Sequence, residues 1–346
     1  MYDLALLDLM KAGRLPKYTR RLLFAFDAGS PRISNETVDS PSFFVRVYDM
    51  PITNKYDLPQ SLMNAVKRFS YSRGKSDMSV TQLIDSPRIV KLKEKHADEI
   101  TTDLSDEIWR LVGSALHLIA ETNTDGTERA EERVFSKVGD ITISGGIDMQ
   151  RTSDGRNVIG DYKFTSAYSV MAGKKEWERQ LNCYAWLVEK EKGVTVDGLE
   201  IYAIVRDWNR RKVGEYNYPK APIVKIPITL WSFETRDEYI KRRVAFHTIA
   251  TENYICTAED MWSTETKYAV LHPKYKRAIK VCNSRKEAED VSESKAGSYV
   301  QLRHGRNVRC EGNYCSVSQF CSQYQASISG DPQRHEGDGD GGEDWP

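Results

Sequence analysis

The chain has 346 residues, and its 50 basic and 50 acidic side chains give a formal net charge of zero at neutral pH. Hydrophobic residues make up 40% of it and charged residues 29%, and no apolar run is long enough to span a bilayer, so no membrane association is expected. The opening MYDLALLDLM contains two aspartates and no basic lead, so we expect no signal peptide and a cytoplasmic location.

The charge is unevenly distributed along the chain. Residues 326–346 are rich in Gly and Asp, with six acidic side chains against one arginine, and they are predicted to form a disordered acidic tail. The rest of the chain therefore carries a net charge of +5, a modest excess that neither supports nor excludes binding to DNA. Residues 1–43 are predicted to be an N-terminal extension of unclear structure.

Three helices are predicted in the first part of the chain. The first begins near Leu58, where Pro59 suits its first turn. The second covers residues 82–96, is interrupted near Pro87 and has Thr81 as its N-cap. The third, over residues 105–121, carries an apolar stripe at helical spacing. His117 lies on the side opposite that stripe, and from the residues alone a solvated histidine is the favoured interpretation.

The stretch of residues 141–166 is predicted to be a β-hairpin. Apolar and polar residues alternate along its first half, which is the period of a half-buried strand. A Ser-Asp-Gly run then supplies the turn. Another strand, residues 131–138, precedes the hairpin and begins with the two acids Glu131 and Glu132.

Three residues of the hairpin have the chemistry of a metal-dependent site. Asp148 is expected at the end of the first strand, and Asp161 and Lys163 share one face of the return strand. Two carboxylates can hold a hard divalent cation such as Mg²⁺ or Mn²⁺. A lysine two residues further on can orient water or steady the charge on a phosphate. A solvent-facing hairpin with an ordinary ion pair is the alternative.

A helix over residues 174–192, ended by Gly193, is predicted to follow the hairpin. Gln180 and Tyr184 are four residues apart and lie on one face of this helix. From the residues alone, Tyr184 is a core residue and Gln180 a surface residue.

A strand over residues 199–206 belongs to the same predicted sheet and leads into a basic turn. Trp208, Arg210 and Arg211 combine an aromatic ring with positive charge, a combination that favours base stacking and phosphate binding. A solvated turn is the alternative.

Three cysteines, Cys310, Cys315 and Cys321, fall within twelve residues near the end of the chain. With no secretory signal, such thiols are expected to be reduced or to bind metal. Their spacing suits zinc or an iron–sulfur cluster, each of which generally takes four ligands. The candidates for the fourth ligand are Cys183, Cys256 and Cys282.

Two of these motifs together resemble a known family. Asp148, followed after twelve residues by Asp161-Tyr162-Lys163, resembles the active-site signature of the PD-(D/E)xK nucleases, and QLNCY at residues 180–184 is similar to the QxxxY motif of their RecB-type exonuclease branch. The similarity covers residues 54–324 and is closest to phage-encoded RecB-like exonucleases. One departure is that the first aspartate follows Gly-Gly-Ile rather than a proline.

The resemblance implies an α/β fold with a mixed central β-sheet flanked by helices. Residues 44–325 would form the nuclease domain, which includes the cysteine-rich segment of residues 256–321. The implied activity is metal-dependent DNA exonuclease activity in phage recombination or DNA processing, in the host cytoplasm. A structure-specific endonuclease and a non-catalytic DNA-binding module of a larger complex are the alternatives. From its composition, the acidic tail is favoured to be a solubilising segment. The alternatives are that it contacts a single-strand annealing or recombination protein, or that it competes with DNA for a basic cleft.

The resemblance also assigns roles to individual residues. Lys163 would be catalytic, and Gln180 and Tyr184 would help to fix the active site and the DNA strand. The ligands of Mg²⁺ or Mn²⁺ would be His117, Glu131, Asp148, Asp161 and the main-chain carbonyl of Tyr162. The ligands of a four-iron, four-sulfur cluster would be Cys256, Cys310, Cys315 and Cys321. Because the C-x4-C spacing of the triplet is wider than the usual C-x2-C, structural zinc stays open.

Overall fold

The structure of the chain is a computed structural model that describes residues 51–68, 74–123, 127–250 and 252–329. The predicted N-terminal extension of residues 1–43 lies outside the described residues. The helix α12 (Ser322–Ser329) extends into the segment predicted to be a disordered tail, so that part of the prediction was wrong. The rest of the predicted tail, residues 330–346, also lies outside the described residues.

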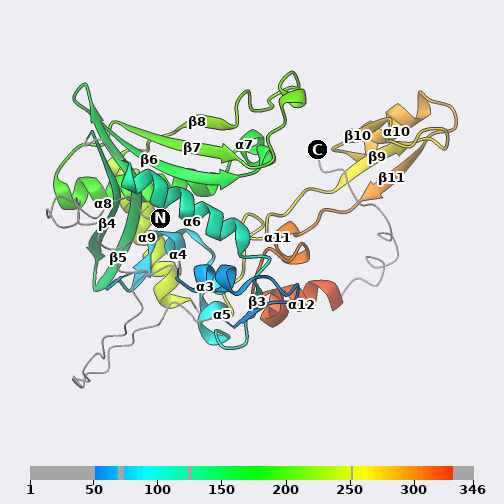
Figure 1. Cartoon of the computed structure of the whole chain (residues 1–346). Helices are drawn as coiled ribbons and strands as arrows, with labels where there is room; N and C mark the ends of the chain where they lie inside the picture. The colour runs from blue at the N-terminus through cyan, green and yellow to red at the C-terminus, as the bar shows by residue number, and fades with distance from the viewer. Residues whose placement is uncertain (1–50, 69–73, 124–126, 251, 330–346) are drawn as a thin grey trace, which may run out of the picture.

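A mixed six-stranded sheet forms the centre of the molecule (Figure 1). Its strands are β2 (Met78–Ser79), β4 (Glu128–Val138), β5 (Ile141–Ser153), β6 (Arg156–Thr165), β7 (Gly198–Val205) and β8 (Ile223–Ile228). The order is β2-β5-β6-β7-β8, with β4 paired to β5. The pairs β2–β5 and β6–β7 are parallel, whereas β4–β5, β5–β6 and β7–β8 are antiparallel. The predicted α/β fold with a mixed sheet is confirmed.

The predicted hairpin is present as β5 and β6. Its two-residue turn places Asp154 and Gly155 at φ values of 52° and 73°, the left-handed conformation that tight hairpins require. The pairing of the two strands stops at Met149 opposite Gly160, and the earlier part of β5 pairs with β2 instead. Asp148 therefore lies inside β5, where β5 and β6 separate, and not at the end of the strand as the sequence predicted.

The helix α8 (Lys175–Lys192) packs on the sheet and supplies the centre of the main hydrophobic core. It ends at Gly193, whose φ of 66° gives the expected left-handed cap. Gly145 in β5 allows the close approach of this helix, because a Cβ at that position would lie 2.7 Å from the ring of Tyr184. The largest fully buried side chains of this core are Trp186, Leu83, Ile143, Ile147, Ile159, Leu181, Leu187, Ile201 and Ile240.

The other helices around the main sheet are α3 (Gln60–Arg68), α4 (Val80–Ile84), α5 (Pro87–Lys95), α6 (Ile108–Thr122), α7 (Ala167–Ala172) and α9 (Phe233–Ile249). The short strands β1 (Ile52–Thr53) and β3 (Thr102–Asp103) pair with each other ahead of α6. Ser79 caps α4 through a capping box with Gln82, so the prediction of Thr81 as the cap was wrong. The helix α6 contacts β6 and β4, and it crosses the sheet beside β6 (Figure 1).

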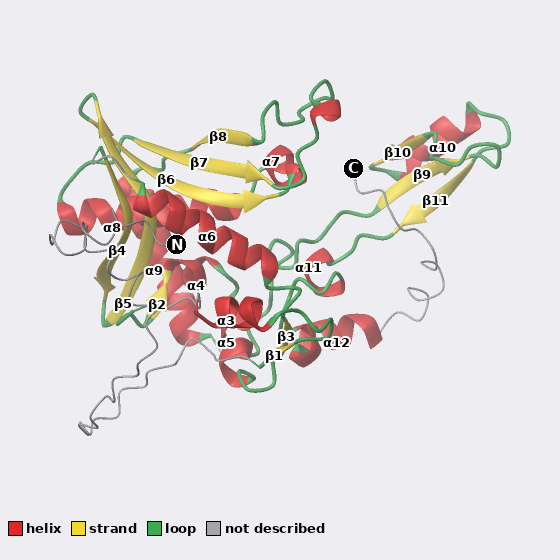
Figure 2. Ribbon diagram, in the orientation of Figure 1, coloured by secondary structure: helices red, strands yellow, loops and turns green. Residues whose placement is uncertain are grey.

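A small three-stranded sheet, which the sequence analysis did not predict, lies between Cys256 and Cys310. It consists of β9 (Lys267–Leu271), β10 (Lys280–Cys282) and β11 (Tyr299–Arg303), and α10 (Arg285–Glu293) packs on it. Figure 2 shows it set apart from the main sheet and joined by two extended connections. The chain then returns through α11 (Val308–Glu311) to the cysteine triplet. No helix among the described residues is long and apolar enough to cross a membrane.

Candidate active site and cysteine cavity

Three predicted metal ligands come together from three different elements. His117 of α6, Glu131 of β4 and Asp148 of β5 each offer a ligand atom, and these atoms lie within 4.8 Å of one another. Nδ1 of His117 is 3.1 Å from Oε1 of Glu131 and 3.4 Å from Oδ1 of Asp148. One imidazole nitrogen and two carboxylates suit Mn²⁺ and, through the carboxylates, Mg²⁺. The donor set therefore fits the predicted divalent cation.

Glu131 reaches this group because its backbone leaves the regular strand conformation. Its φ is 50°, in the left-handed region, although β4 pairs with β5 on either side of it. A non-glycine residue there is uncommon, and strained residues of this kind concentrate at functional sites. The neighbouring Glu132 instead forms hydrogen bonds with Lys192 and Gln150. Of the two adjacent acids, the structure places Glu131 beside the histidine.

The two carboxylates strongly favour the charged form of His117. Burial by itself lowers the pKa of this histidine, but hydrogen bonds and charges from Asp148 and Glu131 outweigh it and raise the pKa to about 10. A proton on His117 and a bound metal cation would each neutralise the same pair of acids.

Asp161 lies next to this group without belonging to it. Its side chain is 1% exposed, and burial together with the charge of Asp148 raises its pKa to about 6, although Lys163 opposes the rise. Nζ of Lys163 is 2.6 Å from Oδ2 of Asp161. The ammonium is therefore the ion-pair partner of this buried carboxylate.

Tyr162 connects the two strands where they separate. Its main-chain N–H donates to Oδ2 of Asp148 over 2.9 Å, so a side chain takes the place of a strand-to-strand hydrogen bond. Its ring contacts the imidazole of His117 edge-on, with the centroids 6.2 Å apart. The predicted ligand role of its carbonyl is not tested by these contacts and stays a prediction.

Gln180 contacts Lys163 directly, and Tyr184 contacts Gln180. Oε1 of Gln180 accepts a hydrogen bond of 3.0 Å from Nζ of Lys163, and its Nε2 donates to Oη of Tyr184 over 2.7 Å. Tyr184 is buried in the main core. Two consecutive hydrogen bonds thus connect the core to Lys163, and the spacing of four residues along α8 brings the two side chains into contact.

The residues of the basic turn after β7 differ in their burial. Trp208 is partly buried against Tyr218 and donates its indole N–H to the carbonyl of Pro219 over 2.9 Å, so its ring has a packing role. Arg210 and Arg211 lie in an exposed 3₁₀ turn, Arg210–Lys212. A DNA-binding role of these arginines stays a prediction.

The four cysteines named as cluster ligands line one cavity. Cys256, Cys310, Cys315 and Cys321 surround it together with apolar side chains of α5. Burial raises the pKa of Cys256 and that of Cys310 to about 11. The other two cysteines are elsewhere: Cys183 lies in the main core and Cys282 in the core of the small sheet.

Two polar side chains contact the sulfurs from the start of α5. Nε of Arg88 donates to Sγ of Cys321 over 3.1 Å, and Oγ of Ser86 lies 3.2 Å from Sγ of Cys256. Arg88 is 3% exposed. Its other two nitrogens donate to the carbonyl of Tyr254 and the hydroxyl of Ser322. No carboxylate of the described residues forms an ion pair with it, so a buried cation faces the cavity, as an anionic centre would require.

The sulfurs are spread more widely than a single zinc ion requires. A tetrahedral site with Zn–S bonds of about 2.3 Å places its sulfurs about 3.8 Å apart. Among the described residues, the group around His117 is the one set of three or more such ligands within 4.8 Å, so no three of the cavity sulfurs are that close.

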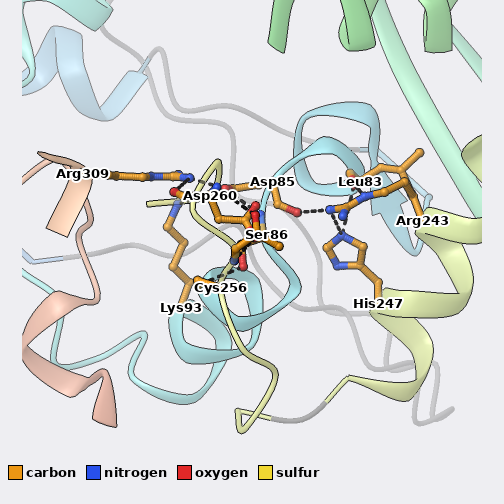
Figure 3. A network of polar contacts seen from close by, with 10 residues as sticks. Leu83, Asp85, Ser86, Lys93, Arg243, His247, Cys256, Asp260 and Arg309 are labelled. Atoms are coloured by element: carbon orange, nitrogen blue, oxygen red, sulfur yellow. Dashed lines mark hydrogen bonds and ion pairs between the residues drawn. The ribbon is translucent and has the colours of Figure 1, made fainter. Parts of the chain in front are cut away.

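A polar network joins the cysteine cavity to α4 and α9 (Figure 3). Asp85, at the end of α4, accepts a hydrogen bond of 2.9 Å from Arg309. Its main-chain carbonyl accepts from Arg243 of α9, and Arg243 also contacts the buried His247. Arg309 lines both the cysteine cavity and a groove that contains Lys163 and Gln180.

Ser86, Arg88 and Arg309 were not predicted from the sequence. Arg88 stands among other basic residues of α5, and nothing in the sequence separates it from the partly exposed Lys91 and Lys93. Arg309 has a weak signal, because it directly precedes Cys310. Burial is what distinguishes these residues, and burial depends on the fold.

Fold and site together define a nuclease of the class that builds its active site on a β-hairpin. The chain belongs to the PD-(D/E)XK nuclease superfamily, whose family model matches residues 69–322. Among solved structures it is similar to one titled "Crystal structure of SSO0001", with 18% sequence identity, a TM-score of 0.39, and coverage of 56% of this chain and 87% of that one. No curated protein matches the chain.

Proposed function

We propose that the protein is a metal-dependent DNA exonuclease of the RecB-type branch that acts in phage recombination or DNA processing. The observation that carries this proposal is the chain of contacts from Tyr184 through Gln180 to Lys163. It connects the QxxxY motif to the lysine of the nuclease signature beside the group of His117 and Asp148. A surface hairpin with an ordinary ion pair has no need for such a buried support.

The proposed metal ligands are His117, Glu131, Asp148, Asp161 and the main-chain carbonyl of Tyr162. Bound there, Mg²⁺ or Mn²⁺ would supply Lewis-acid activation of water and of the scissile phosphate. Lys163 stands at the edge of this group, where its ammonium orients the attacking water and neutralises charge that develops on the phosphate. Gln180 holds the ammonium in that position.

A structure-specific endonuclease is the second candidate for the same site. A non-catalytic DNA-binding module is disfavoured, because both aspartates and the lysine are retained and in contact with their partners. We further propose that residues 44–325 form one nuclease domain that includes the cysteine segment. A contact between the acidic tail and a recombination or single-strand annealing protein stays a proposal on residues outside those described.

For the cysteine cavity we propose a four-iron, four-sulfur cluster held by Cys256, Cys310, Cys315 and Cys321. The buried Arg88 and the wide spacing of the sulfurs support this choice over zinc. The cluster would join α5 and α12 to the segment around Cys256, and so it would stabilise the fold rather than take part in the reaction.

The decisive experiment is digestion of end-labelled linear DNA and closed circular DNA with Mg²⁺ or Mn²⁺. An exonuclease degrades the linear DNA from its ends and leaves the circle intact, whereas an endonuclease opens the circle. Asp161→Asn is the control that must be inactive on both. Wild-type protein that binds DNA but cuts neither form would refute the proposal and leave the binding module.

A further inference from the structure

An exposed aromatic cluster lies beside the active site and is not used by the residues described above. Trp109, near the start of α6, is 53% exposed, and its ring lies 6.0 Å from that of Phe164. The guanidinium of Arg206 lies over the same indole, 5.2 Å from its centroid. Phe164 follows Lys163 in β6, but its side chain is on the opposite face of the strand, the face of Tyr162, which also contacts His117 of α6.

The chemistry of this cluster is that of a site for an aromatic, negatively charged ligand. An exposed indole offers a flat apolar face on which a base can stack. Arg206 is exposed and has no ion pair with a carboxylate of the described residues, so its charge remains available to a phosphate. Nucleic acid strands carry both groups in every unit.

An open strip connects this cluster to the metal ligands. Trp109, Gly113 and His117 follow one another at intervals of four residues, so they lie on the same side of α6. A Cβ at Gly113 would meet nothing within 4 Å, and no residue of α6 is fully buried. The distance along the helix from Trp109 to His117 is about 12 Å. Glycine is the poorest helix former after proline, and no close packing explains it here.

We propose that this strip is a track for a DNA strand with unpaired bases, on which Trp109 stacks a base and Arg206 binds a phosphate beside it. Gly113 leaves room for the strand between that base and the site at His117. The inference rests on the proposed nuclease function and adds a substrate class to it. Stacking uses the face of a base, which a base inside a duplex does not offer, so the strand must be single or locally opened.

The first test measures binding of a fluorescein-labelled single-stranded oligonucleotide by anisotropy with Mg²⁺ present. The parent protein carries Asp161→Asn so that it cannot cut. Trp109→Ala raises Kd by about 5- to 150-fold, the range for loss of one stacked base, and Trp109→Phe restores most of the affinity. Tyr216→Ala is the matched control, because this side chain is 91% exposed and its variant binds as the parent does. Unchanged binding by Trp109→Ala overturns the proposal.

The second test locates the stacked base. A single abasic site is moved along the strand one nucleotide at a time, and cleavage by the wild-type protein falls at one position upstream or downstream of the cut. That penalty disappears in Trp109→Ala, because the partner of the missing base has already been removed. A penalty of the same size at the same position in both proteins overturns the proposal, since the base then contacts another side chain.

The third test separates the track from a loss of folding. Gly113→Ala and Gly113→Leu both raise the melting temperature, because each is a better helix former than glycine. Only Gly113→Leu fills the strip and weakens binding, and unchanged Kd in this variant refutes the track. If the wild-type protein cuts single strands while the Trp109 and Gly113 variants bind normally, only this inference fails. If the wild-type protein cuts no DNA, the proposed function itself fails.

Discussion

Lys163 and Gln180 are joined by a hydrogen bond of 3.0 Å between Nζ and Oε1. It ties β6 to α8 where β5 and β6 separate. Because Gln180 also donates to Tyr184, both ends of its amide are occupied and its orientation is fixed. The ammonium of Lys163 is thereby held against Asp161 and does not move freely in solvent. In the proposed mechanism, Gln180 acts through the lysine and is a positioning residue.

Replacing Gln180 should therefore affect the chemical step more than DNA binding. Gln180→Leu is expected to lower kcat by about tenfold to a hundredfold while KM changes little, because an interaction used mainly in the transition state is lost. Tyr184→Phe, which removes only the far end of the support, should have a smaller effect in the same direction. Steady-state kinetics on linear DNA measures both. Gln301→Leu on the exposed β11 is the control, and a rise in KM alone for Gln180→Leu would contradict this role.

Asp161, a proposed catalytic residue, should be essential for activity but should lower the stability of the metal-free protein. The pKa of Asp161 is raised to about 6, mainly by burial and by the charge of Asp148, so its proton stabilises the fold below pH 3.8 and this contribution is lost as the pH rises to about 6. Asp161→Asn should abolish cleavage and stabilise the metal-free protein at pH 8 by up to about 3 kcal/mol. Denaturation in EDTA at pH 5 and pH 8 measures the gain, which should be larger at pH 8.

Metal gives an internal control for this prediction. In the wild-type protein, Mn²⁺ neutralises the crowded acids, so its addition should raise the melting temperature. Asp161→Asn should respond less, because a ligand has been removed. A variant that is less stable than the wild-type protein at pH 8 without metal would contradict the assignment of Asp161 as a strained, buried acid.

The elements that the sequence predicted well have a strong local signal. The alternation of apolar residues defined the hairpin, and Gly193 marked the end of α8. Position in the fold had no such signal. The left-handed backbone of Glu131 and the separation of β5 from β6 at Asp148 both depend on how β4, β5 and α6 meet. A sequence pattern records which face a residue occupies, but not where two strands part.

The burial of Trp208 and the exposure of Trp109 are both the opposite of what their sequence neighbours indicate. Trp208 stands in a basic turn and has the composition of a stacking site, yet its ring is packed and its indole N–H is bonded. Trp109 stands in an apolar helix and has the composition of a core residue, yet it is exposed. The difference is set by what the rest of the chain covers, which neighbours in sequence do not determine.

The buried His247 should make the protein sensitive to acid. Burial and the charge of Arg243 lower its pKa to about 4, so its contribution is complete above pH 6.5 and is lost as the pH falls towards 4, because only the unfolded chain takes up the proton in that range. The full loss is on the order of 3 kcal/mol. His247→Gln keeps a donor for the carbonyl of Leu83 and should flatten urea-denaturation stability between pH 6.5 and pH 4. An equal slope in both proteins would assign the acid sensitivity to other groups.

The cysteine cavity gives the last prediction, on the ligand set and its buried counter-charge. Cys256→Ala and Cys315→Ala should each lose the bound iron and much of the stability, because all four thiolates are needed to hold one centre. Cys282→Ala is the matched control: this side chain is buried like those of Cys256 and Cys315 but lies outside the cavity, so its variant should keep the iron and lose only about 1 kcal/mol of packing.

Arg88 tests the charge of that centre. With an anionic cluster in place, Arg88→Met leaves the cluster charge without its buried partner and should reduce both iron content and melting temperature, whereas Lys91→Met on the exposed side of α5 should change neither. Iron and zinc analysis together with the visible spectrum of anaerobically purified protein measures the outcome. Colourless protein with one zinc per chain would keep the four ligands and refute the cluster. A more stable Arg88→Met protein with no bound metal would refute an anionic centre. A buried cation without a partner destabilises the fold, so its removal would then raise the stability.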